Sequence, residues 1–416
     1  MHETRATSSW RGRLALAVAL FLAVLTLFLL TQRRIATRGA AGVDRAMAAP
    51  SSSQAQSAAE NARRAAIAAL GPIKRRQGTN AADLYKQAIG LYAALTDEEK
   101  RMLMRRRDKL DPKVAATLYA KIQPIMNLLR RARTADYVDW GFGPITSFTD
   151  PNLSANLHPT QDLAFTALWD ATYRFQSDPD GAVSDLAAME AMSRSGVNSL
   201  IGLLVEDGVH ANGLAVLAQN AASITAVAGP DLADIVNSAV LAQAFQTGMN
   251  SEASILQASL DQYADPATRS GSFIQKFAGS YNDNGGITPQ EAASETQWLM
   301  QTEQQFGATL TEPDAQFQQW WSQKVAQAAP MPLASMALPN FPAARTATLA
   351  LMVENAMMNA GLAIEQSDQA QFQSISDPTS GHPFTYTQTA DGFQLTSALL
   401  RGGKPVTLSF STPAPQ

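Results

Sequence analysis

The sequence predicts a mainly α-helical protein with a single N-terminal transmembrane helix, a multi-helix body and a small C-terminal antiparallel β-sheet. Three observations support this fold class: residues 14–30 form an uncharged apolar run, apolar residues then recur at helical spacing, and the pattern after Ser374 alternates as in strands. We therefore expect six segments. They are an N-terminal tail (1–13), a transmembrane anchor (14–31), a flexible linker (32–57), a basic helical segment (58–135), an acidic helical body (136–373) and a small β module with a tail (374–416).

The apolar run at residues 14–30 is long enough to anchor the chain in a bilayer. At about 1.5 Å per residue it spans roughly 26 Å, close to a hydrocarbon core of about 30 Å. A cleavable signal peptide is the alternative, and it requires a small-x-small site within a few residues of the run. The first such site, Ala46-Met47-Ala48, lies far downstream. We therefore expect an uncleaved anchor in contact with membrane lipid, and cleavage before about residue 49 stays the alternative.

The orientation of the anchor is not decided by charge, because arginines flank both of its ends. Long domains that follow an anchor are exported largely regardless of flanking charge. We therefore expect a single-pass protein of the cytoplasmic (inner) membrane of a bacterium, with its body on the extracytoplasmic, periplasmic side. The chain has no cysteine, which fits either side of the membrane.

The net charge of −4 hides a strong division along the chain. Residues 1–135 contain 24 Lys and Arg against 9 Asp and Glu, whereas residues 136–416 contain 8 against 27. The basic part has three interpretations: helix faces that complement the acidic body, contact of the basic 33–133 region with anionic lipid, and nucleic-acid binding. We do not expect nucleic-acid binding, because the basic residues lack interleaved aromatic residues and a recognisable motif.

Helices are predicted through most of residues 58–373. Thr96 and Glu99 form a capping box, and Asp111-Pro112 opens the next helix. The segment 197–227 is apolar on most faces and should be the most buried helix. We expect it to end before Gly229-Pro230. Its acidic residues argue against a second membrane span. The remaining helices are expected at 159–175, 183–192, 231–246, 251–263, 269–279, 289–307, 312–328 and 343–366.

The C-terminal module is predicted to be a β-hairpin followed by a third strand. The segments 384–387 and 393–396 flank the turn at Asp391-Gly392, and 406–410 forms the last strand.

Several stretches of the chain resemble a known group of proteins. They are 163–181, 200–205, Leu338-Pro339 and the alanine-rich 343–364 helix. In these stretches the chain resembles large, uncharacterised, exported or anchored proteins of Planctomycetes, Verrucomicrobia and Acidobacteria. The end of the chain, Asp377-Pro-Thr-Ser-Gly-His-Pro-Phe-Thr-Tyr386, resembles an Asp-Pro-x-x-Gly-x-Pro-x-x-Tyr hairpin of major pseudopilins. The resemblance implies an exported helical body with a β tail, but no activity. The prepilin start motif is missing, so we do not expect a pilin subunit.

Two groups of residues are candidate metal sites. In a calcium-loop alignment of residues 280–291, Asn282, Asn284 and Glu291 occupy ligand positions, but Ser280 stands where an aspartate is needed. The same residues also read as a turn followed by a capping box from Thr288 to Glu291. We therefore expect no metal at this loop.

A second candidate is the pair Glu206 and His210, which share one face of a helix. The sequence offers no third ligand, so a lone buried histidine is the expected outcome. Neither candidate predicts a bound cofactor.

The sequence contains no signature of nucleophile or phosphate chemistry. It has no cysteine, no Gly-x-Ser-x-Gly elbow, no phosphate-binding loop and no His-Glu-x-x-His. We therefore expect a membrane-anchored, non-catalytic scaffold or interaction protein of the cell envelope, with an unknown protein partner. Two alternatives stay open: a hydrolase or carbohydrate-active protein that uses Asp136 and Asp139 beside Trp140, and a pseudopilin-like component of a secretion assembly.

Overall fold

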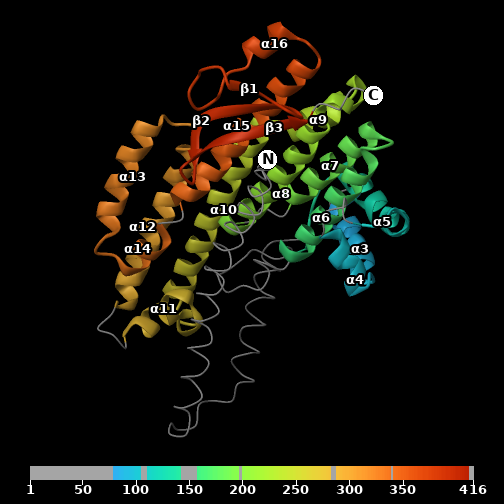
Figure 1. The fold of residues 1–416 in the computed structure, drawn as a ribbon. Coiled ribbons are helices and arrows are strands. Elements are labelled where there is room, and N and C mark those ends of the chain that lie inside the picture. The colour runs from blue at the N-terminus through green and yellow to red at the C-terminus, as the bar shows by residue number, and fades with distance from the viewer. Residues whose placement is uncertain are drawn as a thin grey trace, which may run out of the picture. The chain divides into compact units, whose positions relative to one another are not determined.

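The computed structural model describes residues 78–104, 110–141, 157–195, 199–282, 287–338 and 341–411, all within one compact unit that spans Gly78–Gln416. The predicted N-terminal tail, anchor and linker lie outside these residues. The prediction of a mainly helical chain with a C-terminal antiparallel sheet is confirmed (Figure 1).

The described α-helices occupy most of the unit, with short 3₁₀ turns between some of them. The α-helices are α3 (Ala81–Ala93), α4 (Asp97–Leu103), α5 (Pro112–Arg133), α6 (Leu157–Arg174), α7 (Pro179–Arg194), α8 (Leu200–Gln219), α9 (Gly229–Ile235), α10 (Ser238–Ala264), α11 (Phe273–Asn282), α12 (Pro289–Ala308), α13 (Asp314–Ala328), α14 (Pro332–Ala337), α15 (Phe341–Glu365) and α16 (Gln369–Ser374). The 3₁₀ turns are η3 (Ala221–Ser223), η4 (Ala226–Ala228) and η5 (Arg269–Gly271).

Local capping explains where several helices begin. Asp111 accepts hydrogen bonds from the backbone N–H groups of the first turn of α5, and Pro112 occupies its first position. The capping box between Thr96 and Glu99 is present at α4, as predicted. The apolar side chains of α5 recur every three to four residues and are buried against α3, α6 and α7.

Two hydrophobic cores share α15. The first core joins α3, α5, α6, α7 and the C-terminal halves of α8 and α15 with the sheet. The second core is rich in aromatic rings from α10, α12 and α13, and it includes the N-terminal half of α15. Its centre is Phe306, which stacks on Phe341 with ring centroids 4.8 Å apart.

The sequence prediction for α8 is wrong in two respects. The helix ends at Gln219, well before Gly229-Pro230, because Asn220 closes it and the 3₁₀ turn η3 follows. It is also less buried than α15. Both helices are long and apolar enough to cross a membrane, but half of the apolar window of α8 and 72% of that of α15 are buried inside the protein. Such burial is typical of core helices.

The segment 231–263 also differs from its prediction. We expected two helices of similar length, whereas the structure has the short helix α9 followed by one continuous helix α10. Gly248 lies inside α10, where it packs against the side chain of Leu203 on α8. A Cβ at this position would lie 3.5 Å from Leu203, an ordinary van der Waals distance, so α8 leaves room for a small side chain there.

The C-terminal sheet is a three-stranded antiparallel meander of strand order β1-β2-β3. Its strands are β1 (Thr385–Thr389), β2 (Gly392–Arg401) and β3 (Lys404–Ser411). The buried face of β2 and β3 packs on α8 and α15 (Figure 1). A Cβ atom at Gly361 of α15 would overlap the ring of Phe410 on β3, so this contact requires glycine.

The loop before β1 is organised by Asp377. Its carboxylate accepts hydrogen bonds from the backbone N–H of Thr379 at 2.8 Å, from the hydroxyl of Ser397 and from the backbone N–H of Ala398 at 3.3 Å. Burial alone would raise the pKa of Asp377, but these hydrogen bonds hold it below its usual value. The Asp-Pro-x-x-Gly motif thus fastens the loop to β2.

Candidate functional site

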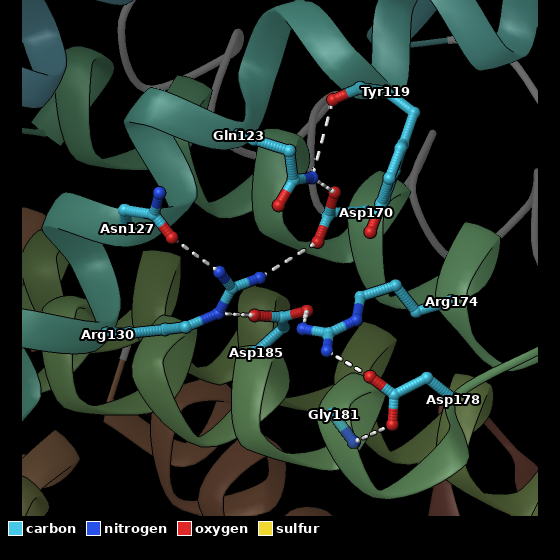
Figure 2. Close-up of polar contacts among 9 residues, drawn as sticks. All are labelled: Tyr119, Gln123, Asn127, Arg130, Asp170, Arg174, Asp178, Gly181 and Asp185. Carbon is cyan, nitrogen blue, oxygen red and sulfur yellow. Dashed lines mark hydrogen bonds and ion pairs between the residues drawn. The ribbon is translucent and has the colours of Figure 1, made fainter.

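The clearest polar site in the described residues is a buried cluster between α5, α6 and α7 (Figure 2). We call it the aspartate–arginine cluster. Its members are Gln123 and Arg130 of α5, Asp170 and Arg174 of α6, and Asp185 of α7.

Asp185 is the acceptor at the centre of this cluster. One carboxylate oxygen accepts a hydrogen bond from Nε of Arg130 at 2.6 Å, and the other accepts one from Nη1 of Arg174 at 2.9 Å. The side chain of Asp185 has no exposed surface, whereas the two arginine side chains keep 26% and 17% of theirs. The buried carboxylate of Asp185 therefore binds one guanidinium group from α5 and one from α6.

Asp170 has weaker contacts with the arginines. It accepts a hydrogen bond from Nε2 of Gln123 at 2.7 Å and lies 3.5 Å from Nη2 of Arg130. Burial, followed by a hydrogen bond and the charge of the adjacent Asp185, raises the pKa of Asp170 to about 8. Asp170 is therefore mainly protonated at neutral pH, and its carboxyl group can donate a hydrogen bond to the carboxylate of Asp185.

The open end of the cluster is closed by the start of α7. Asp178 caps this helix by accepting from the backbone N–H of Gly181 at 3.0 Å, and it forms an ion pair with Arg174. The hydrogen bond from Gly181 and the ion pair lower the pKa of Asp178. A Cβ at residue 181 would overlap the guanidinium of Arg174 and the carboxylate of Asp178, so a larger residue here would displace this ion pair.

Aromatic rings cover one side of the cluster. The ring of Tyr173 stacks on Tyr119 with centroids 4.4 Å apart and on Trp169 at 5.7 Å. Burial is the main cause that raises the pKa of Tyr119. An acid and a base side by side can in principle transfer protons. In this cluster both carboxyl groups are enclosed, and their contacts tie three helices together.

A second buried site, the glutamate–histidine cluster, lies between α7, α8 and α15. It consists of Glu190 and Arg194 of α7, Glu206 and His210 of α8, and Asn355 of α15. Nδ1 of His210 lies 2.9 Å from Glu190, and Nε2 lies 2.8 Å from Oδ1 of Asn355. Arg194 lies 3.7 Å from both glutamates.

The electrostatics of this second cluster favour protonated side chains. Burial lowers the pKa of His210, but the charge of Glu190 and the hydrogen bonds outweigh this effect and raise it to about 9. Burial, then the charges of Asp207 and Glu190, raises the pKa of Glu206 to about 8. Burial likewise raises the pKa of Asp207 to about 7. At neutral pH the cluster therefore holds protons that the same groups would release in water.

No known protein family, curated protein or solved structure matches this chain. The resemblance of the tail to a pseudopilin hairpin thus stays a prediction.

The structure places the predicted pair Glu206 and His210 in one cluster, but their closest contacts go to different partners. His210 pairs with Glu190 and Asn355, whereas Glu206 faces Arg194. In the part of the chain that the structure describes, no group of three or more His, Asp or Glu residues is arranged to hold a metal ion.

The candidate calcium loop is only partly described. Asn284 lies outside the described residues, and Asn282 is the last residue of α11. Glu291 accepts from the backbone N–H of Thr288 at 2.7 Å, and its own N–H donates to the Thr288 hydroxyl at 3.2 Å. These bonds form the capping box of α12 and lower the pKa of Glu291.

The acidic residues beside Trp140 have structural partners. Asp136 accepts from the backbone N–H of Thr79 at 2.6 Å, and Asp139 accepts from that of Gly141 at 2.8 Å. Trp140 itself stacks on Tyr85 with centroids 5.6 Å apart. These contacts fix the chain that follows α5 against α3.

Part of the basic segment pairs with the acidic body of the same chain. Besides the contacts of Arg130, Arg133 donates to Asp231 and Asp234, each at 2.7 Å. This is the first of the three interpretations of the charge division, and it holds for these residues.

Sequence reasoning missed Asp170, Asp185 and Glu190. Only their positions in the sequence could have identified them, because each lies on the core-facing side of its helix, where apolar residues recur. An aspartate at such a position needs a buried partner, but the sequence does not identify which arginine supplies it.

Proposed function

We propose that this chain is a non-catalytic interaction protein of the cell envelope. In this proposal, residues 14–31 anchor it in the cytoplasmic membrane and the body lies on the extracytoplasmic side. One observation carries the non-catalytic part. The two facing carboxyl groups that a hydrolase would need, Asp170 and Asp185, are fully buried and bound to side chains of their own protein.

The anchor and its orientation rest on sequence. The uncharged run at residues 14–30 is the reason for proposing a membrane protein, and the length of the chain that follows is the reason for proposing export. Contact with anionic lipid is a smaller part of the proposal. Arg130 and Arg133 already form internal ion pairs, so it would depend on other exposed basic residues such as Lys113 and Arg131.

Protease accessibility in spheroplasts, combined with crosslinking, tests this proposal. We expect external protease to degrade the body of the full-length chain, and crosslinking in intact cells to give the same higher-mass products repeatedly. A body protected from external protease would overturn the orientation. Recovery of a freely soluble chain that begins near Ala49 would overturn the anchor, and repeated crosslinking without any product would contradict the interaction role.

An activity screen addresses the rival function. A hydrolase that uses the aspartate–arginine cluster would lose its activity in both Asp170→Asn and Asp185→Asn variants. Glycan or peptide hydrolysis by the wild-type chain that both variants abolish would replace our proposal with the enzyme.

A further inference from the structure

The two edges of the C-terminal sheet differ in their protection. An exposed edge strand can pair with another chain, and proteins usually block this with charged residues, proline or a bulge. At one edge, β3 carries Lys404 and Pro405, its pairing with β2 is irregular between Thr396 and Leu400, and its inner face packs on α8 and α15. This edge is protected.

The other edge, β1, has none of these features. All five residues of β1 (Thr-Tyr-Thr-Gln-Thr) are exposed, and they include no charge and no proline. Among the described residues, β1 pairs with no strand except β2, in a regular register from Thr385↔Thr396 to Thr389↔Gly392.

β1 also extends beyond the helical body. Tyr386 and Gln388 stand opposite Leu395 and Phe393, which are buried, so they belong to the inner face of the sheet. Tyr386 nevertheless keeps 44% of its surface exposed, although its ring stacks on Phe393 at 5.4 Å. Both faces and the outer edge of β1 are therefore open to another strand.

We infer that β1 pairs with β1 of a second copy of this chain, in antiparallel orientation about a two-fold axis at Thr387. This inference rests on the proposed interaction function and names the partner. The pairing would join two three-stranded sheets into one continuous sheet, and closed two-fold symmetry prevents further growth.

Self-complementarity favours a second copy over a foreign strand. An axis at the central residue places Tyr386 opposite Gln388 of the second copy, and these side chains already hydrogen-bond to each other within one chain. No like charges meet along the strand, because it carries none.

The affinity of this contact is expected to be low. Five residue pairs bury much less surface than the roughly 1,200–2,000 Å² of a stable interface. Two chains tethered to the same membrane would supply the local concentration that the contact needs. The experiment therefore uses the full-length chain in membranes.

A single introduced cysteine tests the pairing directly, because the natural chain has none. Directly opposed residues of antiparallel strands have Cα atoms about 4.5–5.5 Å apart, within the range of a disulfide. We expect Thr387→Cys to form a disulfide-linked dimer under mild oxidation in membranes. Ser409→Cys, which is also exposed but lies on the protected edge, is the matched control and should stay monomeric.

A second variant pair checks that the crosslink reports strand pairing. Adding Gln388→Lys to Thr387→Cys puts a charge into the edge, and we expect it to reduce the dimer yield at least fivefold. Equal dimer yields for Thr387→Cys and Ser409→Cys would overturn the inference. Crosslinking of the Thr387→Cys variant to a different protein would also overturn self-pairing, but it would leave the proposed interaction role standing.

Discussion

Substitution of Asp185 is the strongest test of the aspartate–arginine cluster. Asp185→Asn removes the negative charge that faces Nε of Arg130 at 2.6 Å and Nη1 of Arg174 at 2.9 Å. Loss of one partner from a buried ion pair costs about 3–5 kcal/mol. Because both arginine side chains keep some exposed surface, they can recover part of their hydration. We therefore expect a loss of about 3 kcal/mol in the free energy of unfolding.

Two matched variants make this expectation specific. Asp234 also pairs with an arginine, at 2.7 Å, but 65% of its side chain is exposed, so Asp234→Asn should cost only about 0.2–1 kcal/mol. Below about pH 4, where the folded and the unfolded carboxyl group both hold the proton, Asp170→Asn should cost less than about 1 kcal/mol, because an amide can keep the hydrogen bonds of a neutral carboxyl group. At neutral pH the cost should be smaller still, because the variant does not have to keep a proton that the unfolded carboxyl group releases.

Urea unfolding of the full-length chain in mild detergent, followed by tryptophan fluorescence at several pH values, measures these differences. Folded Asp170 keeps its proton up to about pH 8, whereas the unfolded group releases it near pH 4. Wild-type stability should therefore fall between these values by up to about 1.4 kcal/mol per pH unit, and Asp170→Asn should remove this contribution. Equal losses from Asp185→Asn and Asp234→Asn, or from Asp185→Asn and Asp170→Asn, would refute the reasoning.

Three further predictions concern other parts of the fold. Folded His210 holds its proton to about pH 9, whereas the unfolded side chain releases it near pH 6.5, so the free energy of unfolding should fall as the pH rises through this window. In urea titrations His210→Gln should flatten this slope. An unchanged slope would contradict the raised pKa of His210. Gly361→Ala should cost about 1–3 kcal/mol through overlap with Phe410, and adding Phe410→Leu should recover part of the loss in thermal melts; no recovery would place the strain elsewhere. Asp377→Asn should cost about 1–3 kcal/mol and accelerate hydrogen exchange of β2 amides, because several donors lose a charged acceptor, whereas unchanged exchange would show that the loop does not stabilise the sheet.

Features encoded by neighbouring residues were predicted well. The capping boxes at Thr96 and Thr288, the start of α5 after Asp111 and the hairpin turn at Asp391 each depend on a few adjacent side chains. Such local hydrogen bonds form in the same way wherever the segment lies.

Features that depend on distant residues were not predicted. α10 runs without a break through Gly248, where it packs near Leu203 of another helix. Likewise, the contact between Arg130 and Asp185 joins residues 55 positions apart. Helical spacing identifies the face that a side chain occupies, but the partner is fixed only when the helices pack.

The shared position of α15 has a consequence for the order in which the protein folds. Its first half belongs to one hydrophobic core and its second half belongs to the other. The core that contains the first half cannot close before about Leu349, and the core that contains the second half also needs β2 and β3, so early segments wait with apolar surface uncovered. If the body is exported as proposed, this delay would keep the emerging chain in the extended form that passage through a membrane requires, and maturation would be completed after translocation.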